Sequence, residues 1–221
     1  MPIDAHTHVN KGSGRNILAS PCEGVGDFFG FHPWYLEDFD AAKLAAALER
    51  NPKLGVGEIG LDRLKAKTIS PKMRDAFLIQ LELAAKYQRP VVLHGAKCWG
   101  EVVKMVRPFA AKIPAMLFHG FSRSPGLIPE IVALNGYISV GPAVLNDHAV
   151  NYRALVKALP LERVLVETDA VTDTLDNAVD IVEIAAMTAK IKNLDESEFV
   201  AIVNANTERF MHSSLRIKGE K

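Results

Sequence analysis

Near its start the chain places metal-competent side chains at alternate positions, from Asp4 through His6 to His8. In an extended strand, side chains two positions apart point to the same face, so these three groups should project together. Imidazole nitrogens and carboxylate oxygens are ligands for zinc and related divalent ions. A His-x-His pair is weak evidence by itself. The run is therefore either an exposed strand face or half of a metal site. Metal-competent residues elsewhere in the chain would favour the second interpretation.

Further metal-competent side chains stand at the ends of apolar runs. They are Glu58 in the run 54–59, His94 in 90–94, His119 in 114–119 and Asp169 in 163–169. Each one alone is more commonly a satisfied polar group, a helix cap or a salt-bridge partner. Four histidines and two carboxylates together are different, because ionisable groups seldom lie unpaired beside a core. The combination favours a metal centre.

A donor set of this size indicates more than one metal ion. One Zn²⁺ takes about three or four protein ligands, whereas a larger set suits two ions bridged by a carboxylate. Imidazole favours Zn²⁺, Mn²⁺, Fe²⁺ or Co²⁺ over Mg²⁺, while the carboxylates leave Mn²⁺ and Mg²⁺ open. We therefore expect two divalent metal ions, with zinc, manganese and magnesium as the candidates.

The pattern after residue 50 predicts the scaffold that gathers these residues. Apolar runs at 54–59, 90–94, 114–119, 136–141 and 163–169 alternate with helical segments near 71–88, 98–111, 125–135, 147–159, 174–192 and 195–212. Ser70 before Pro71, and Asp195 three residues before Glu198, are typical of helix N-termini. Apolar strands separated by helices form a parallel sheet. With strands at 2–6 and 27–32, the pattern predicts a (β/α)₈ TIM-type barrel, in which all strand C-terminal ends meet at one mouth.

The first fifty residues fit this barrel less well. Between His8 and Phe28 the chain holds only Gly-, Ser- and Pro-rich segments and the short run 16–20. A parallel crossover needs about a dozen residues or more and is usually helical. We therefore expect an α/β barrel trimmed in its first units, with the early helices lost, and a single domain over residues 1–221.

The charge balance limits how the protein could hold a partner. Its 221 residues include 26 Lys and Arg and 26 Asp and Glu, so the formal net charge is zero. This argues against binding of nucleic acid by bulk electrostatics alone. No apolar run reaches the roughly 18 residues of a membrane span, and no basic segment leads into an apolar one at the start. We expect a cytoplasmic protein without membrane contact; a monomer is favoured, although the sequence does not fix the oligomeric state.

The motifs that carry these residues follow one another as they do in a known family. They are DAHTH at 4–8, GFHPW at 30–34, GEIGLD at 57–62, VLH at 92–94, HGFS at 119–122 and ETDA at 167–170. Together they resemble the TatD-like metal-dependent hydrolases of the amidohydrolase-like superfamily, commonly described as TatD deoxyribonucleases. The resemblance runs through nearly the whole chain. The ligands that it implies are His6, His8 and Asp169 for one ion, His94 and His119 for the other, and Glu58 as the bridge.

The resemblance also implies a reaction. Two metal ions would activate a water molecule for hydrolysis of a phosphodiester, possibly in DNA, with Glu58 and Asp169 as the catalytic carboxylates. Basic residues beside the site could contact neighbouring phosphates. The residues placed in the second shell or against substrate are His32, Asp62, Arg63, Lys65, Lys97 and Arg123.

The chain departs from the family near the mouth. The family usually continues its fifth-strand histidine with Ser-Arg, where this chain has Gly95 and Ala96, and Val171 stands in place of a proline. These departures resemble a short divergent branch and weaken the inference of a DNA substrate. The alternative is a metal-dependent amidohydrolase or lactonase acting on a small molecule. Many such enzymes carry a carboxylated lysine where this chain has Glu58. A non-catalytic metal-binding protein is a third interpretation.

Overall fold

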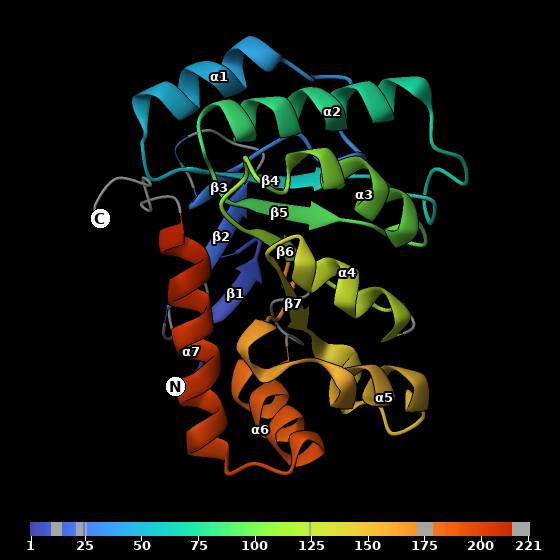
Figure 1. Ribbon diagram of the computed structural model, residues 1–221, viewed down its shortest axis with the longest axis vertical. Helices are drawn as coiled ribbons and strands as arrows, with labels where there is room; N and C mark the ends of the chain where they lie inside the picture. Colours follow the sequence, from blue (N-terminus) through green and yellow to red (C-terminus); the bar gives the residue numbers. More distant parts are fainter. Residues whose placement is uncertain (10–14, 21–23, 25, 124, 172–178, 214–221) are drawn as a thin grey trace.

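Eight parallel strands follow one another around a barrel in chain order (Figure 1). The computed structural model describes residues 1–9, 15–20, 24, 26–123, 125–171 and 179–213. Each strand pairs in parallel with the next one in the chain. The predicted TIM-type barrel is confirmed. The strands are β1 (Asp4–Thr7), β2 (Asn16–Ser20), β3 (Phe28–Phe29), β4 (Gly55–Gly60), β5 (Val91–His94), β6 (Met116–Phe118), β7 (Gly136–Val140) and β8 (Val164–Val166).

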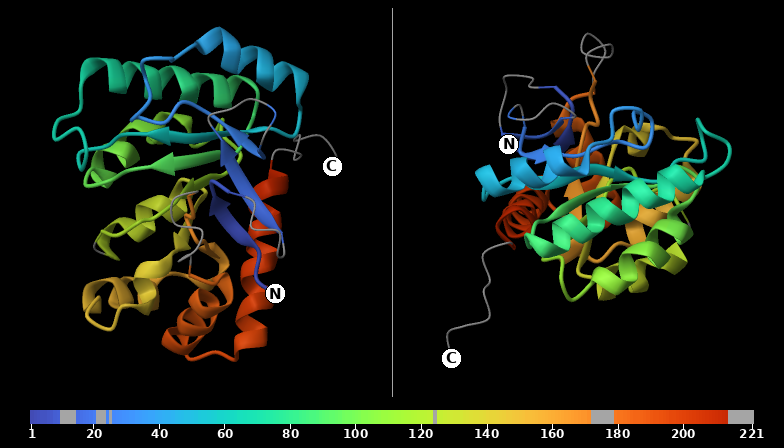
Figure 2. Two further views of the ribbon diagram at one scale, coloured as in Figure 1. Left: turned by 180° about the vertical axis from the view of Figure 1, so that it is seen from behind. Right: turned by 90° about the horizontal axis from the view of Figure 1, so that it is seen from above.

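Helices follow most of the strands and cover the outside of the barrel (Figure 2). They are α1 (Ala41–Arg50), α2 (Pro71–Lys86), α3 (Trp99–Val106), α4 (Ile128–Ala133), α5 (Val150–Ala158), α6 (Ile181–Lys192) and α7 (Glu196–His212). The predicted caps are present, since Ser70 accepts the N–H of Met73 and Asp195 accepts that of Glu198. Part of the helix predicted at 174–192, residues 174–178, lies outside the described residues. Across the described chain, no helix combines the length and apolar character needed to cross a membrane.

The third unit keeps its helix, which corrects the expectation that the early units have lost theirs. Asp40 caps α1 by accepting the N–H groups of Ala42 and Lys43, and the helix buries Leu44 and Leu48. Alanine-rich sequence with such a stripe is strongly helical. The units that have lost their helices are the first two. Among the described residues, the connections from β1 to β2 and from β2 to β3 contain no helix, and the short run 16–20 is a strand.

Backbone hydrogen bonds close the barrel between β1 and the segment that follows β8. The N–H of Asp169 donates to the carbonyl of His6 at 3.1 Å, and the N–H of His8 donates to the carbonyl of Ala170 at 2.9 Å. These bonds alternate along β1 as they do in a parallel ladder. They place both histidines directly beside Asp169, although more than 160 residues separate them in sequence.

Asp4 strengthens this closure by bonding to the segment that follows β8. Its carboxylate accepts hydrogen bonds from the backbone N–H and the hydroxyl of Thr168, at 3.0 Å and 2.6 Å. The group is almost fully buried, and burial raises its pKa, against the hydrogen bonds from Thr168 that lower it. Losing the carboxylate would leave both Thr168 donors unpaired in the interior, at about 1–3 kcal/mol each. Asp4 is therefore a structural link between β1 and β8.

The barrel interior is apolar toward the N-terminal ends of the strands. Phe210 of α7 stacks on Phe28 with ring centroids 5.7 Å apart, and α7 lies on the side of the strand tails (Figure 1). The buried cluster there comprises Ile3, Ala5, Ile17, Ala19, Phe28, Val92, Ala115, Leu117, Tyr137, Leu165 and Phe210. Packing of this kind makes the interior a core and not a pore.

The next inward positions toward the strand C-terminal ends are polar. Because side chains two residues apart in a strand point to the same face, the next inward residue lies two positions after each inward apolar residue. These polar positions are His94 after Val92, His119 after Leu117 and Glu167 after Leu165. The apolar interior thus ends where a layer of ionisable groups begins, at the mouth.

Candidate metal centre

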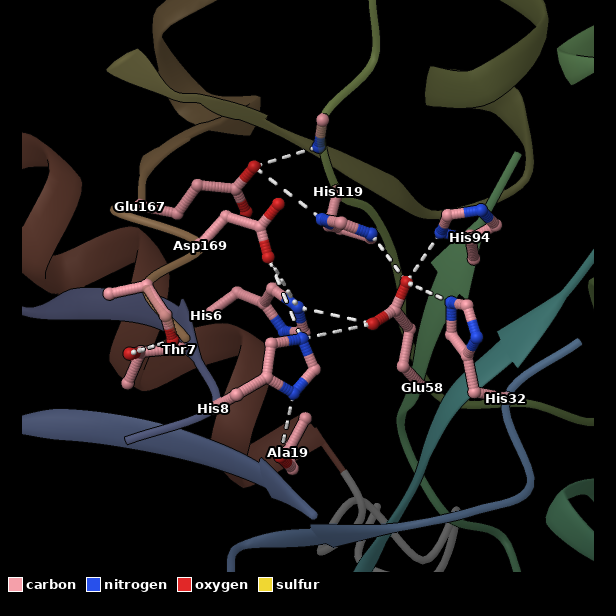
Figure 3. A network of polar contacts seen from close by, with 12 residues as sticks. His6, Thr7, His8, Ala19, His32, Glu58, His94, His119, Glu167 and Asp169 are labelled. Carbon is pink, nitrogen blue, oxygen red and sulfur yellow. Dashed lines mark hydrogen bonds and ion pairs between the residues drawn. The ribbon is translucent and has the colours of Figure 1, made fainter. Parts of the chain in front are cut away.

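Glu58 lies at the middle of a ring of imidazoles at this mouth (Figure 3). Its side chain is only 4% exposed. Oε1 lies 2.6 Å from His94 Nδ1 and 2.6 Å from His119 Nε2. Oε2 faces the other way, 3.5 Å from His6 Nε2 and 3.3 Å from His8 Nε2. Each oxygen of this one carboxylate therefore faces a separate pair of histidines.

The first donor group consists of His6, His8, Glu58 Oε2 and Asp169. Asp169 Oδ1 lies 3.6 Å from Nε2 of both histidines, and Glu58 Oε2 lies 3.3–3.5 Å from the same atoms. A tetrahedral ion with ligands at about 2.0–2.2 Å holds neighbouring ligand atoms about 3.3–3.6 Å apart. In addition, the buried His6 Nε2 has no hydrogen-bond partner among the described residues. The spacing and the unpartnered nitrogen both fit a divalent cation.

The second donor group consists of Glu58 Oε1, His94 and His119. At 2.6 Å the two imidazoles hydrogen-bond directly to the carboxylate oxygen. Metal binding displaces protons from such ligands, because the metal takes the same nitrogen lone pair. The donor types fit zinc or a related ion, as they do in the first group.

The outer ring nitrogens of His8 and His94 are also held by hydrogen bonds, and that of His119 faces a carboxylate beyond hydrogen-bond distance. His8 Nδ1 donates to the carbonyl of Ala19 at 3.1 Å, which leaves Nε2 free to face the first group. His94 Nε2 lies 2.9 Å from Asp62 Oδ2, and His119 Nδ1 lies 3.6 Å from Glu167 Oε1. Partners of this kind fix the tautomer and orientation of a metal-binding imidazole. The arrangement thus aims one nitrogen of each ring at Glu58.

Ionisation in the centre follows from its charges. Burial raises the pKa of Glu58, but attraction to His119 and hydrogen bonds from several histidines outweigh it and hold this pKa well below its ordinary range. Burial also raises the pKa of Asp169, and the bond with His8 leads the effects that bring it below its ordinary value. Asp62 and Glu167 place two further carboxylates beside His94 and His119. The lowered pKa values of Glu58 and Asp169 keep negative charge where a divalent cation would bind.

His32 faces the same carboxylate, but its ring carries the proton on Nε2, whereas that of His8 donates from Nδ1. Its Nδ1 accepts the backbone N–H of Trp34 at 3.2 Å, so Nε2 carries the proton and points to Glu58 Oε1 at 3.4 Å. Burial lowers the pKa of His32, which keeps the ring neutral. A protonated Nε2 donates a hydrogen bond and cannot bind a metal ion. His32 is thus close enough to join a metal site, but its hydrogen bonds give it the role of a donor.

The predicted basic residues lie in loops at the same end of the barrel. Arg63 and Lys65 follow β4, Lys97 follows β5 and Arg123 follows β6, and all four are exposed. Lys65 is tied to the centre through its backbone, because its N–H donates to Asp62 Oδ1 at 2.6 Å. Their positions are compatible with contacts to substrate phosphates, which stays a prediction.

Three features of the centre were not identified from the sequence. Glu167 beside His119 could have been found from the two-residue period of β8, because it follows the inward Leu165. Trp34 and Tyr35 line a cavity beside Glu58. No periodicity marks these two, because they lie in a loop after β3.

Asp62→Asn tests whether the carboxylate beside His94 orients it for a cation. An asparagine amide placed opposite Nε2 favours the tautomer with the proton on Nδ1, the nitrogen that faces Glu58. We expect the weaker of two Zn²⁺ binding events to lose about 10- to 100-fold in affinity, measured by calorimetry. Asp75→Asn on the exposed surface of α2 is the matched control. Unchanged affinity at both sites would refute this orienting role.

Known proteins resemble this chain along most of its length. Residues 15–212 match the protein family described as TatD related DNase. The "3'-5' ssDNA/RNA exonuclease TatD" of Klebsiella pneumoniae (strain 342) is 31% identical over 168 residues, which cover 74% of this chain and 64% of that protein. The "Uncharacterized metal-dependent hydrolase YabD" of Bacillus subtilis (strain 168) is 26% identical over 190 residues, covering 81% of this chain and 74% of the other.

The likeness extends to solved structures. The crystal structure of YjjV, a TatD homolog from Escherichia coli K12, matches with a TM-score of 0.78 and 24% identity, covering 95% of this chain and 96% of that one. The agreement covers the whole barrel and shows a shared fold. In sequence, the chain spans slightly less than two thirds of the Klebsiella exonuclease.

Proposed function

The chain belongs to the TatD-related DNase family, and we propose that it is a divalent-metal-dependent phosphodiesterase that acts on nucleic acid. The observation that carries this proposal is the position of Glu58, with each carboxylate oxygen turned to a separate pair of histidines. This is the donor arrangement expected of two cations that share one carboxylate. The name of the Klebsiella relative supports a nucleic-acid substrate.

We propose two ions, with zinc, manganese or magnesium as the candidates. His6, His8 and Asp169 would hold one, and His94 and His119 the other, with Glu58 shared. When bound, the ions would lower the pKa of a water molecule and offset negative charge on phosphoryl oxygens. The two oxygens of Glu58 support this number, because each of them faces a separate pair of histidines.

Asp169 is the residue best placed to accept a proton during hydrolysis. Its side chain is 46% exposed, whereas those of Glu58 and His6 are 4% and 1% exposed. Its lowered pKa keeps it ionised at neutral pH, so it can take a proton from an attacking water molecule. His32 Nε2, already a donor, is oriented toward the same space and can hydrogen-bond to a substrate oxygen.

The alternative of amide or lactone hydrolysis has less support. Glu58 occupies the place where many enzymes of that kind carry a carboxylated lysine. The basic residues around the mouth also suit an anionic substrate better than a neutral one. We therefore keep the phosphodiesterase as the proposal and treat the alternative as an outcome of the assay.

A substrate panel tests the proposal directly. Purified protein with known metal content is incubated with single-stranded DNA, RNA, a generic phosphodiester, a lactone and an amide, beside Asp169→Asn. We expect cleavage of the phosphodiesters and a loss of about 100-fold in the variant, the range for a missing proton acceptor. Equal activity of both proteins would reveal a contaminating nuclease. Cleavage of only the lactone or the amide would overturn the proposal.

A further inference from the structure

Two large aromatic side chains are exposed at the edge of the metal centre. Trp34 is 39% exposed and Tyr35 is 53% exposed, in the loop after β3. Exposed aromatic side chains that lie together at the rim of a cavity are typical of binding sites. His32, two residues before Trp34, contacts Glu58, and the Trp34 ring lies 6.0 Å from that of His94 between centroids.

The two rings form one wall of a cavity of about 240 Å³ that reaches the metal centre. Ala19 and Val171 also line it, together with His8 and Glu58 of the metal centre. Pockets for drug-sized ligands have about 300–1,000 Å³, so this one is smaller. It suits a single nucleoside and is too small for a base pair.

The wall is held in place before any ligand arrives. The backbone N–H of Trp34 donates to His32 Nδ1, and the two rings meet edge-on with centroids 4.8 Å apart. Tyr35 lies beside them, 6.4 Å from Trp34 between ring centroids. A preformed aromatic surface loses little conformational entropy on binding.

Lys65 completes the surface. Its Nζ lies 4.5 Å from the ring centroid of Trp34 and 5.7 Å from that of Tyr35, in cation–π geometry. The backbone of Lys65 is fixed by Asp62, which also holds His94 of the second donor group. The exposed cation therefore lies over the two rings, on a backbone that is bonded to the same Asp62 carboxylate as His94. An anion joined to a flat ring would satisfy both features together.

We propose that Trp34, Tyr35 and Lys65 form a stacking platform for the terminal nucleoside of a single strand. The rings of Trp34 and Tyr35 are inclined by 72° to each other, so the base would stack on the face of one ring and meet the edge of the other. The Lys65 ammonium would move from the ring faces to a phosphate. Base–aromatic stacking tolerates any base, because every base has a π-face. This inference rests on the proposed function, and it adds which side chains would hold the base and the adjacent phosphate.

Binding can be followed without turnover. The chain has two tryptophans, and Trp99 is buried, so Trp34 is the fluorophore that a ligand in this cavity can reach. We titrate the Mg²⁺-loaded protein with dAMP and with deoxyribose 5-phosphate, which lacks the base. We expect dAMP to quench the fluorescence and bind about 10-fold more tightly than the sugar phosphate. The quenching should persist in Trp99→Phe and disappear in Trp34→Phe.

Substitution of the second ring tests the platform further. Tyr35→Ala should weaken dAMP binding about 10-fold and leave binding of deoxyribose 5-phosphate unchanged. Leu78→Ala, which removes an exposed apolar side chain from the outer face of α2, is the control and should bind as the wild type does. Equal affinity for the two ligands, or dAMP binding unaffected by Tyr35→Ala, would overturn the platform.

The outcome separates this inference from the proposed function. An oligonucleotide with a normal terminal nucleotide is compared with one ending in an abasic nucleotide. Efficient cleavage of both at the same KM would uphold the phosphodiesterase and reject the platform. Base-dependent binding of dAMP without cleavage of any phosphodiester would uphold the nucleoside site and reject the proposed reaction.

Discussion

Glu58→Gln is expected to lower kcat by about 1,000-fold or more and to reduce the bound metal from two ions toward one or none. The carboxylate accepts from His94 and His119 through one oxygen and faces His6 and His8 through the other. An amide keeps one acceptor and presents N–H groups on its other side, so it cannot serve both donor groups. Losing a shared ligand removes several kcal/mol of charge stabilisation, and each 1.4 kcal/mol is about tenfold in rate.

The measurement combines steady-state kinetics with metal analysis of the same samples. Glu82→Gln on the exposed surface of α2 is the matched control and should keep both activity and metal. Because Glu58 is buried among imidazoles, its variant must also be checked for folding by circular dichroism. Glu58→Asp provides a second test, since it keeps the charge and shortens the reach, and we expect an intermediate loss. Full activity of a folded Glu58→Gln protein with two bound ions would exclude the shared role.

The sequence predicts the barrel and its ionisable mouth because both depend on short-range patterns. His94 and His119 end apolar strands, and a parallel barrel brings such ends together whatever the intervening loops. Asp169 follows the same rule from the far end of the chain. What the pattern cannot assign is the hydrogen-bond partner of each group. Asp4 shares the spacing of the two histidines, yet it bonds to Thr168.

The early units show a second limit. A crossover without a helix has no periodicity, so β2 could not be distinguished from a loop, and α1 was overlooked beside it. Pairing with β1 and β3 is what makes residues 16–20 a strand. Trp34 and Tyr35 lie in such a region too. Their exposure depends on where the loop after β3 crosses the mouth, which is a property of the tertiary structure.

The two donor groups would allow a chain of zero net charge to bind divalent cations. Equal numbers of acidic and basic residues cancel over the whole surface. At the mouth, however, carboxylates are gathered inside a ring of imidazoles, where the effective dielectric constant is lower than in water. The affinity for a cation would therefore depend on the charges at the mouth, and the net charge of the whole chain does not predict it.

Metal binding is expected to become tighter by about 100-fold for each cation between pH 6 and pH 8. Burial lowers the pKa of His8, but hydrogen bonds with Asp169 and Glu58 outweigh it and raise this pKa to about 10. Burial also lowers the pKa of His119, and attraction to Glu58 outweighs it, so this pKa lies well above its ordinary value of 6.5. Both rings therefore carry a proton in the metal-free protein at neutral pH.

Each cation must displace one of these protons into the solvent. The first donor group loses the proton of His8, and the second loses that of His119. Below the raised pKa, affinity rises about tenfold per pH unit for each proton released. Calorimetry in two buffers of different ionisation enthalpy counts the protons directly, and we expect about two per protein. His212→Gln, on the exposed surface of α7, should leave the count unchanged. Affinity independent of pH across this range would contradict the protonated rings.

The same shifts predict different dependences of Tm on pH for the metal-free and the metal-loaded protein. A histidine whose pKa is raised by folding stabilises the folded state fully below its unfolded pKa of about 6.5, and this stabilisation is lost as pH rises through the folded value. The Tm of the metal-free protein should therefore fall between pH 7 and pH 10. Excess Zn²⁺ binds only the folded centre and replaces the lost proton, so the loaded protein should keep its Tm over the same range. A parallel decline of both would mean that the imidazoles of His8 and His119 do not exchange their protons for a cation.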